Sequence, residues 1–256
     1  MCISEPVMQN YQAPSDLLKD RVILVTGAGS GIGRAASIAF ATHGATVILL
    51  SKTLPNLESV YDEIEELGAP TPAIYPMHLE GATTRDYEEL GEKLESSFGR
   101  LDGILHDAAI NPYLSRIKDY DPQDWMKVMQ VNINAPFMIT QVCLPLLLKS
   151  DDASLIFTSD RVGRRAKAYW GAYAASKFAQ EALMQTLAEE LEDSPVRVNS
   201  IDPGPTRTQM RKNIFPGEDI NKIKPPEALM PLYLWLMGPD SKNTHGEALA
   251  WEEAQQ

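Results

Sequence analysis

The segment Val22–Leu50, VILVTGAGSGIGRAASIAFATHGATVILL, constrains the fold of this chain more than any other stretch. A β-branched apolar run leads into clustered glycines, then into an alanine-rich helical pattern and a second apolar run. Gly27 permits a tight turn, Gly31 lets the backbone approach a pyrophosphate, and Gly33 lets the helix pack closely on the strand. A glycine triplet alone is weak evidence, and a ligand-free connection is the alternative. Its place between strand and helix, where free N–H groups favour phosphate, predicts a dinucleotide site.

The rest of the chain alternates apolar runs with helical patterns, as expected of βαβ units around a buried parallel sheet. We therefore expect an α/β fold: a single Rossmann-like, doubly wound domain over residues 1–256, with a seven-stranded parallel sheet and helices on both faces. The expected strands are Val22–Thr26, Thr46–Leu50, Ala73–His78, Gly103–His106, Ser154–Ser159, Val196–Ile201 and Ala248–Trp251. The expected helices are Gly31–His43, Asn56–Leu67, Thr84–Phe98, Pro122–Leu148, Tyr173–Leu191 and Pro226–Met237.

Two segments lie outside this alternation. Residues 1–17 are expected to form an N-terminal extension. Residues 207–224 have no clear period, and we interpret them as a loop, with one short helix at most, that forms a lid over a substrate. Met210, Ile214 and Phe215 in this lid predict a partly apolar ligand, unless they pack on the core.

The charge balance argues against a nucleic-acid-binding protein. The chain has 35 acidic and 23 basic residues, and its one short basic run, Arg161–Lys167, is explained by a solvated loop or an anion contact. Cys2 and Cys143 give neither a disulfide framework nor a metal-ligand spacing, so we expect no metal. The N-terminus lacks a signal-peptide pattern and no apolar run is long enough to span a bilayer. We therefore expect a cytoplasmic protein without membrane contact.

The end of the second expected strand bears on the choice of dinucleotide. A site for NAD usually has an acidic residue there, which binds the ribose 2′-hydroxyl. This chain has Ser51 and Lys52 instead, and Arg34 follows the glycine-rich loop. Without a carboxylate to repel a 2′-phosphate, and with two cations close by, NADP is favoured over NAD. The alternative is that both cations are solvated surface residues.

Tyr173 and Lys177 stand at positions i and i+4 of an expected helix, and therefore lie on the same face. A phenol with a pKa of about 10 is a poor acid at neutral pH. A neighbouring ammonium group stabilises the phenolate and makes proton exchange with a substrate oxygen feasible. This pair is common on helix surfaces, but together with a phosphate-binding loop it indicates a reductase site.

These motifs resemble the short-chain dehydrogenase/reductase family over nearly the whole chain, from Leu18 to about Trp251. The resemblance is carried by TGxxxGIG at 26–33, VNINAPF at 131–137, the Tyr-x-x-x-Lys pair and DPGPTRT at 202–208. The amino-acid sequences LDGILH and WGAYAASKFA are most similar to those of a bacterial branch of unassigned oxidoreductases, the YciK type. The resemblance implies an NAD(P) cofactor and hydride transfer between nicotinamide and the carbonyl or alcohol carbon of a small molecule.

The resemblance also implies a role for each matching residue. Tyr173 matches the general acid/base, Lys177 matches the lysine that binds the nicotinamide ribose and tunes the tyrosine, and Asn132 matches the asparagine that holds a proton-relay water. Because members of the family commonly associate through their long helices, a homodimer or homotetramer is expected. The expected cofactor-binding residues are Gly27, Ser30, Gly31, Ile32, Gly33, Arg34, Ser51, Lys52, Ala108, Tyr173, Lys177, Pro203, Gly204, Thr206 and Thr208.

Three departures from the family pattern cluster in the expected site. The Asn-Asn-Ala-Gly that usually follows the fourth strand is HDAA at 106–109, which adds a methyl group where the backbone passes the cofactor. The acidic residue that usually ends the third strand is replaced by His78, with Glu80 close behind. We expect both changes to weaken cofactor binding without preventing it. The third departure is Asp160, which stands where the family has its catalytic serine, thirteen residues before Tyr173.

Asp160 bears directly on activity. The family's serine donates a hydrogen bond to the substrate oxygen, whereas an ionised aspartate only accepts one. At about 5 Å and an effective dielectric constant of about 20, this charge raises the pKa of Tyr173 by about two units. Asp160 avoids the conflict if it stays protonated and donates, as some buried carboxylic acids do. The other rescues are donation by Thr158 or Ser159, although adjacent strand residues face opposite ways, or neutralisation by Arg161, Arg164 or Arg165.

Two classes of function remain open. An NADP-dependent carbonyl reductase or alcohol dehydrogenase is favoured, because Asn132, Tyr173, Lys177 and the phosphate loop are all present. The alternative is a non-catalytic nucleotide-binding or interaction protein on the same fold, which the three departures favour. A lost enzyme is expected to lose the tyrosine and lysine too, so the first class is preferred.

Overall fold

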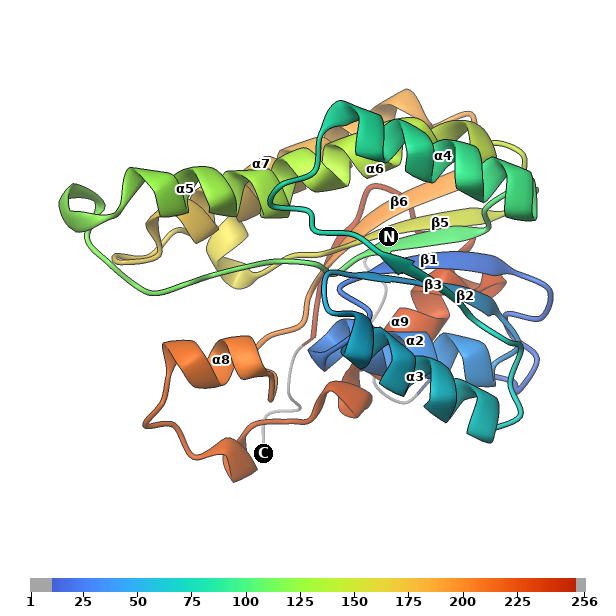
Figure 1. Cartoon of the computed structure of the whole chain (residues 1–256), viewed down its shortest axis with the longest axis horizontal. Helices are drawn as coiled ribbons and strands as arrows, with labels where there is room; N and C mark the ends of the chain where they lie inside the picture. Colours follow the sequence, from blue (N-terminus) through green and yellow to red (C-terminus); the bar gives the residue numbers. More distant parts are fainter. Residues whose placement is uncertain (1–10, 252–256) are drawn as a thin grey trace.

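The computed structural model describes residues 11–251, and a sheet of seven parallel strands runs through this part of the chain (Figure 1). Its order is β3-β2-β1-β4-β5-β6-β7, which confirms the predicted fold class. Residues 1–10 of the expected N-terminal extension, with Cys2, lie outside the described residues. The strands are β1 (Val22–Thr26), β2 (Thr46–Ser51), β3 (Ala73–Pro76), β4 (Gly103–His106), β5 (Ala153–Thr158), β6 (Val196–Asp202) and β7 (Ala248–Ala250).

Helices cover both faces of the sheet, with α2, α3 and α9 on one side and α4, α5, α6 and α7 on the other (Figure 1). Each side has its own apolar core, built around residues such as Phe40 and Tyr233 on the first and Tyr87 and Met184 on the second. Strands β4, β5 and β6 are buried throughout, as expected when both sheet faces are covered. The helices are α2 (Gly31–Thr42), α3 (Leu54–Glu66), α4 (Thr84–Phe98), α5 (Pro122–Met129), α6 (Ala135–Leu147), α7 (Gly171–Glu190), α8 (Gln209–Ile214) and α9 (Met230–Met237).

Two expected helices differ in detail from the structure. The stretch Pro122–Leu148 is not one α-helix, because a π-helical segment, Gln130–Asn134, separates α5 from α6. Pro136 has no N–H to donate to the carbonyl four residues before it, which weakens a regular α-helix at this point. The last expected helix begins as a 3-10 turn, Pro226–Leu229, before α9. Here Pro231 has the same effect on the preceding turn.

The expected lid, residues 207–224, is more ordered than a plain loop. It contains α8 and a 3-10 turn, Ile220–Lys222. A parallel bridge between Thr206 and Lys224 joins the two ends of the segment. In Figure 1 the segment lies beyond the end of the sheet, to the left of α2 and α3 and below α5.

The strand order reverses between β1 and β4, and in open α/β sheets ligands bind at the carboxyl ends of strands near such a switch point. The segments that follow β1, β4, β5 and β6 begin at Gly27, Asp107, Ser159 and Pro203. Among residues 11–251, no helix has both the length and the apolar content needed to cross a bilayer. The same residues contain no group of three His, Cys, Asp or Glu side chains arranged to hold a metal ion.

Candidate active site

The loop between β1 and α2 is shaped to admit phosphate groups. Gly27 and Gly31 have φ angles of 73° and 56°, a left-handed conformation that favours glycine. A Cβ atom on Gly33 would lie 2.5 Å from the carbonyl oxygen of Gly27, so a side chain there would collide with the loop. Ser30 precedes α2 without capping it, and the first turn contains no acidic residue. The N–H groups at this helix start therefore suit a pyrophosphate.

The residues expected to meet the adenosine end lie in two environments. Ser51 and Lys52 line the cavity that begins at the glycine-rich loop, and His78 lines it from the segment after β3. The guanidinium of Arg34 instead forms an ion pair with Glu63 of α3, and Arg34 does not line the cavity. Lys52 is therefore the better placed of the two expected cations for a 2′-phosphate.

A cavity of about 300 Å³ extends from this loop across the carboxyl ends of β1, β4, β5 and β6. Of the residues predicted for the site, only Gly33, Arg34 and Asn132 do not line it. The predicted residues that do line it are Gly27, Ser30, Gly31, Ile32, Ser51, Lys52, Ala108, Asp160, Tyr173, Lys177, Pro203, Gly204, Thr206 and Thr208.

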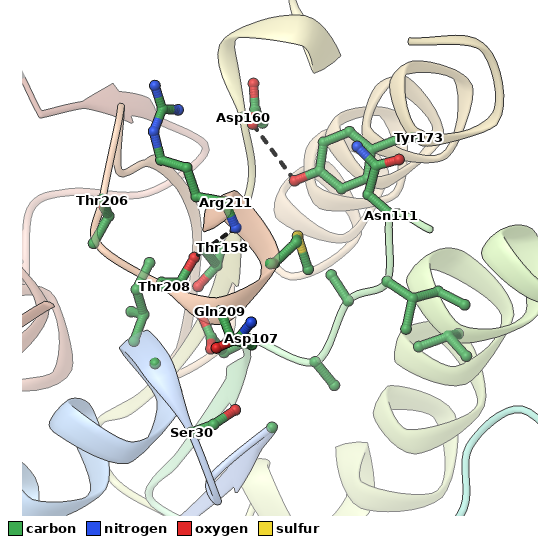
Figure 2. Close-up of a pocket in the computed structure, with 18 of the residues that line it drawn as sticks. Ser30, Asp107, Asn111, Thr158, Asp160, Tyr173, Thr206, Thr208, Gln209 and Arg211 are labelled. Atoms are coloured by element: carbon green, nitrogen blue, oxygen red, sulfur yellow. Dashed lines mark hydrogen bonds between the residues drawn. The ribbon is translucent and has the colours of Figure 1, made fainter. Parts of the chain in front are cut away.

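Asp160 and Tyr173 point toward one another in this cavity (Figure 2). The Tyr173 hydroxyl donates to Oδ2 of Asp160 at 3.5 Å, the long limit of a hydrogen bond. The second carboxyl oxygen, Oδ1, accepts from the backbone N–H of Val162 at 2.9 Å, and this contact fixes the side chain. The carboxyl group therefore lies even closer to the phenol than the sequence suggested.

Two of the three arginines suggested to neutralise Asp160 bind other carboxylates. Arg161 lies 3.9 Å from Asp202, and Arg164 lies 3.1 Å from Glu181. Within residues 11–251, no ion pair involves Asp160. The suggestion that Arg161 or Arg164 neutralises this carboxylate is therefore wrong.

The two alternative hydroxyl donors also differ from each other. The Thr158 hydroxyl lies 3.1 Å from the hydroxyl of Tyr233, so it already has a partner. Ser159 is among the residues that line the cavity, but its hydroxyl is buried and has no partner among the described residues. Its backbone N–H donates to the carbonyl of Ile201 at 2.7 Å, which continues the pairing of β5 with β6 one residue past Thr158. Ser159 therefore donates to a substrate oxygen only if its side chain turns toward the cavity.

The electrostatic environment opposes ionisation of both partners. Burial raises the pKa of Asp160, and the charge of Asp202 raises it further, while the Val162 N–H, Lys177 and Tyr173 oppose these effects. Burial, and then the charge of Asp160, raise the pKa of Tyr173 well above its ordinary value. The phenol is therefore a weaker acid than usual, and an ionised Asp160 weakens it further.

Lys177 is held beneath the tyrosine by two hydrogen bonds. Its ammonium group donates to the carbonyl oxygen of Thr158 at 2.5 Å and to Oε1 of Gln180 at 3.0 Å. The nitrogen lies 5.7 Å from the centre of the Tyr173 ring. Burial lowers the pKa of Lys177 to about 8, although the charge of Asp160 opposes this shift. The lysine is therefore cationic at neutral pH and loses its charge in mildly alkaline solution.

Asn132 lies behind the cavity, where it connects three segments. In the π-helical segment, its amide accepts from the N–H of Ile110 at 2.8 Å and donates to the carbonyl of Ile110 at 3.0 Å. The same amide donates to the hydroxyl of Ser176 on α7 at 3.0 Å. Asn132 is fully buried, so its side chain positions α7 and the segment after β4 relative to each other.

Two of the substitutions at the end of β4 and just after it are accommodated by packing. His106 is buried, stacks on Phe157 with ring centres 4.9 Å apart, and bonds the hydroxyl of Thr140 at 2.9 Å. Burial lowers the pKa of His106 to about 3, so the ring is neutral in the folded protein. Ala109 packs against a small apolar cluster that includes Tyr173, which gives its extra methyl group a place.

Asp107 introduces a second carboxyl group into the cavity. Burial raises its pKa to about 6, while a hydrogen bond from the Thr158 hydroxyl, the charge of Lys177 and the N–H of Gly33 oppose the shift. Asp107 thus accepts at the start of α2, the same helix end that suits a phosphate. An anionic ligand at this loop therefore meets repulsion from Asp107 once the carboxyl ionises.

The structure adds residues that the sequence argument missed, notably Asn111 and Trp170. Asn111 lines the cavity beyond β4, and a polar residue at the carboxyl end of a parallel strand was the signal for it. The ring centre of Trp170 lies 5.7 Å from that of Tyr173 and 6.1 Å from that of Phe215. The segment 207–224 thus meets Trp170 beside the tyrosine through two tilted ring pairs, and no local pattern marked Trp170.

A phosphate-binding loop and an acid/base pair that meet at one edge of a parallel sheet are typical of oxidoreductases that use nicotinamide dinucleotides. The family model for short chain dehydrogenases matches residues 21–219. The chain is 50% identical to the oxidoreductase YciK of Escherichia coli K12 over 237 residues, which cover 93% of this chain and 94% of that protein. The chain therefore belongs to the short-chain dehydrogenase/reductase family and is an oxidoreductase. The predicted likeness to the YciK-type branch is confirmed.

Solved structures agree with this assignment. A short chain dehydrogenase from Pseudomonas syringae is 52% identical with a TM-score of 0.93, covering 95% of this chain and 99% of that one. A second, from Escherichia coli CFT073, was solved in complex with NADPH and is 50% identical with a TM-score of 0.91, covering 94% of this chain and 100% of that one. The family thus accounts for the loop, the sheet and the cavity described above.

Proposed function

We propose that this oxidoreductase transfers a hydride between NADP(H) and the carbonyl or alcohol carbon of a small molecule. The observation that carries the proposal is that Tyr173 and Lys177 line the same cavity as the glycine-rich loop. A group able to exchange a proton with a substrate oxygen thus lies beside the expected dinucleotide site. The left-handed glycines and the uncapped start of α2 fit the phosphates of that cofactor.

Each residue of the site has a separate role in this reaction. When bound, NADPH supplies the hydride. Tyr173 gives its proton to the substrate oxygen, and the charge of Lys177 stabilises the phenolate that this leaves. Asp160, in its protonated form, donates a second hydrogen bond to the same oxygen. Asn132 is a positioning residue, because it holds α7 through Ser176.

NADP is proposed over NAD on two grounds. Ser51 and Lys52 line the cavity where an NAD site has an acidic residue, so no carboxylate at this position repels a 2′-phosphate. The relative from Escherichia coli CFT073 was crystallised with NADPH, which supports the same choice here.

A non-catalytic nucleotide-binding protein is the second candidate. The observation in its favour is the carboxyl of Asp160 beside Tyr173, since an ionised carboxylate gives no hydrogen bond to a substrate oxygen and weakens the acid next to it.

A paired assay separates the two candidates. NADPH binding is measured by fluorescence, and oxidation of NADPH is then screened with diketones, quinones and aldehydes in the wild type, Asp160→Ser and Tyr173→Phe. We expect all three to bind NADPH, and Tyr173→Phe to lower kcat/KM by roughly 10²- to 10⁴-fold. Binding without turnover in the wild type, with activity restored by the serine, supports the second candidate. Absence of NADPH binding contradicts both.

We also propose that the chain forms a single domain, that residues 207–224 act as a substrate lid, and that the protein is a homodimer or homotetramer. Exposed aromatic rings on two long helices, Phe137 of α6 and Phe178 of α7, support association through these helices. Light scattering at micromolar concentration tests the oligomer, which a monomeric mass contradicts.

A further inference from the structure

We infer that Asp160 gives this site a second class of substrate: with Asp160 ionised the site reduces the protonated C=N bond of an imine, and with Asp160 protonated it reduces a carbonyl. The inference rests on the NADP(H)-dependent hydride transfer proposed above. It concerns the atom that the substrate presents to Asp160 and Tyr173.

The geometry leaves one carboxyl oxygen of Asp160 directed toward the reacting end of the cavity. Oδ1 is committed to the N–H of Val162, whereas Oδ2 meets only the Tyr173 hydroxyl, at the long distance of 3.5 Å. A bond this long is readily replaced by a better donor. An ionised carboxylate accepts and never donates, so the complementary substrate atom there carries a hydrogen. The nitrogen of a protonated imine carries one, and a carbonyl oxygen does not.

The charged groups around Asp160 form no ion pair with it among the described residues. Asp202, at the end of β6, adds negative charge, and its own partner is Arg161 at 3.9 Å. Lys177 of α7 is turned to Thr158 and Gln180, although its charge still favours the carboxylate. From the lid, Arg211 lines the cavity but forms its ion pair with Glu218.

Aromatic rings form the wall next to this carboxylate. Trp170, Tyr173 and Phe215 line the cavity, and the ring centre of Trp170 lies 5.7 Å from that of Tyr173 and 6.1 Å from that of Phe215. The faces of such rings attract cations, and a carboxylate beside them adds a charge-assisted hydrogen bond. The combination suits a planar cation that carries an N–H group, which describes a protonated imine.

The reduction of such a cation balances without a proton from Tyr173. The imine carbon accepts a hydride, with its electron pair, from NADPH and forms a C–H bond. The π electrons of the C=N bond become the lone pair of the amine, and the nitrogen keeps the proton it already carried. The products are the amine and NADP⁺. Asp160 remains ionised throughout and keeps the imine protonated before the hydride arrives.

Reduction of a carbonyl makes the opposite demand on Asp160. Negative charge develops on the carbonyl oxygen, and Tyr173 becomes a phenolate when it gives up its proton. Both charges arise beside Oδ2, so an ionised Asp160 repels them. A protonated Asp160 removes this repulsion and donates a hydrogen bond to the carbonyl oxygen. The ionisation of one side chain therefore decides which substrate class reacts.

The test uses three probes of similar size: dihydroisoquinoline as a cyclic imine, its N-methyl iminium salt, and the ketone tetralone. Steady-state oxidation of NADPH is followed from about pH 5 to about pH 9 in the wild type, Asp160→Ser and Asp160→Asn. In the wild type we expect kcat/KM for the ketone to fall as pH rises through the ionisation of Asp160. We expect no such fall for the imine at the same pH.

Replacement of Asp160 separates the probes further. In Asp160→Ser we expect the pH-dependent fall for the ketone to disappear, and kcat/KM for the imine to drop by about tenfold or more, the loss of one charge-assisted hydrogen bond. The N-methyl salt has the charge but no N–H, so the substitution affects it less. Asp160→Asn keeps the shape of the side chain but removes its charge. With the ketone, we expect this variant to react as the wild type does when Asp160 is protonated.

Three results overturn the inference. Reduction of the ketone without reduction of the imine contradicts it and leaves the proposed function intact, as does an equal effect of Asp160→Ser on both probes. No oxidation of NADPH with any probe, in protein that binds NADPH by fluorescence, contradicts the inference and the proposed function together. Asp151→Ser, an exposed aspartate in the turn before β5, is the matched control for loss of a carboxylate.

Discussion

Burial and three carboxyl groups act on the Tyr173 hydroxyl. Burial raises its pKa most, and the charges of Asp160, which contacts it directly, Asp107 and Asp202 raise it further. Lys177, 5.7 Å from the ring centre, has the charge that stabilises a phenolate, but burial lowers the pKa of this lysine to about 8. The acid strength of Tyr173 therefore depends on burial and on the protonation of several neighbours rather than on the lysine alone.

The alkaline side of the pH profile reports on Lys177. Because the pKa of this lysine is about 8, we expect kcat/KM to fall above about pH 8 as the ammonium loses its proton. The charge of Asp160 raises that pKa, so Asp160→Asn is expected to move the alkaline fall to lower pH. An alkaline fall that stays in place in Asp160→Asn, or moves to higher pH, contradicts this assignment.

The Arg34–Glu63 ion pair predicts a change in cofactor preference. In the wild type Glu63 engages Arg34, which follows the phosphate loop. Glu63→Gln removes that charge and releases the guanidinium, so we expect KM for NADPH to fall severalfold and KM for NADH to change little. Glu66→Gln removes an exposed carboxylate from the same helix and is the control. An equal change in KM for NADPH and for NADH excludes a contact between Arg34 and the 2′-phosphate of NADPH.

At the scale of elements, the site depends on a close approach between α2 and the loop before it. The first turn of α2 lies so near the carbonyl of Gly27 that Gly33 has no room for a Cβ atom. Asn132 plays a similar part on the other side, where the π-helical segment brings its amide to both Ile110 and Ser176. Each contact fixes the position of a helix that faces the cavity.

Gly33→Ala tests the first of these contacts. The added methyl group would lie 2.5 Å from the Gly27 oxygen, so the loop must move. We expect NADPH binding to weaken by about tenfold or more and stability to fall by about 1–3 kcal/mol, as for other overpacked sites. Gly217→Ala, in the lid, has no neighbour within 4 Å of the added Cβ and serves as the control. Unchanged binding in Gly33→Ala means that the loop does not cradle phosphate.

Element positions were largely predictable from sequence, and the exceptions have local causes. The alternation of apolar runs and helical periods located all seven strands, even β7 with its three residues, because each apolar run is separated from the next by a helical pattern or a loop. The break between α5 and α6 was missed, since Gln130–Asn134 continues the apolar period of its neighbours. The π-helical turn places Asn132 in contact with Ile110, a residue from another segment, and a contact of this kind leaves no pattern in the local sequence.

At the scale of the whole molecule, the buried centre of the sheet makes stability depend on pH. His106 lies in β4 between two layers, and its pKa falls from about 6.5 when unfolded to about 3 when folded. The neutral ring thus contributes stability that is complete above about pH 6.5 and is lost as pH falls toward 3. Asp107 acts in the opposite direction between about pH 4 and 6, where the folded state binds the extra proton.

His106→Asn is therefore expected to resist acid better than the wild type. In the wild type, His106 takes up a proton when the protein unfolds at low pH, and this favours the unfolded state. An asparagine takes up no proton, so the substitution removes an acid-dependent loss of roughly 3–5 kcal/mol in the free energy of unfolding, before relaxation. Acid unfolding followed by circular dichroism should shift its midpoint to lower pH. His78→Asn, at an exposed position, is the control. If the midpoint of acid unfolding moves to higher pH, His106 affects stability through its packing and not through its protonation.

The sequence by itself determined the Rossmann-like sheet, the glycine-rich loop between β1 and α2, and the placement of Tyr173 and Lys177 four residues apart on one helix. These are local features, because strand–turn–helix order and i, i+4 spacing are set by neighbours along the chain. The tertiary structure alone decided that Arg34 pairs with Glu63 and that Asp160 has no cation of its own. Those partners come from separate elements, and their distances and burial set the charges. Whether Asp160 acts as an acid or as an acceptor is therefore a property of the folded site.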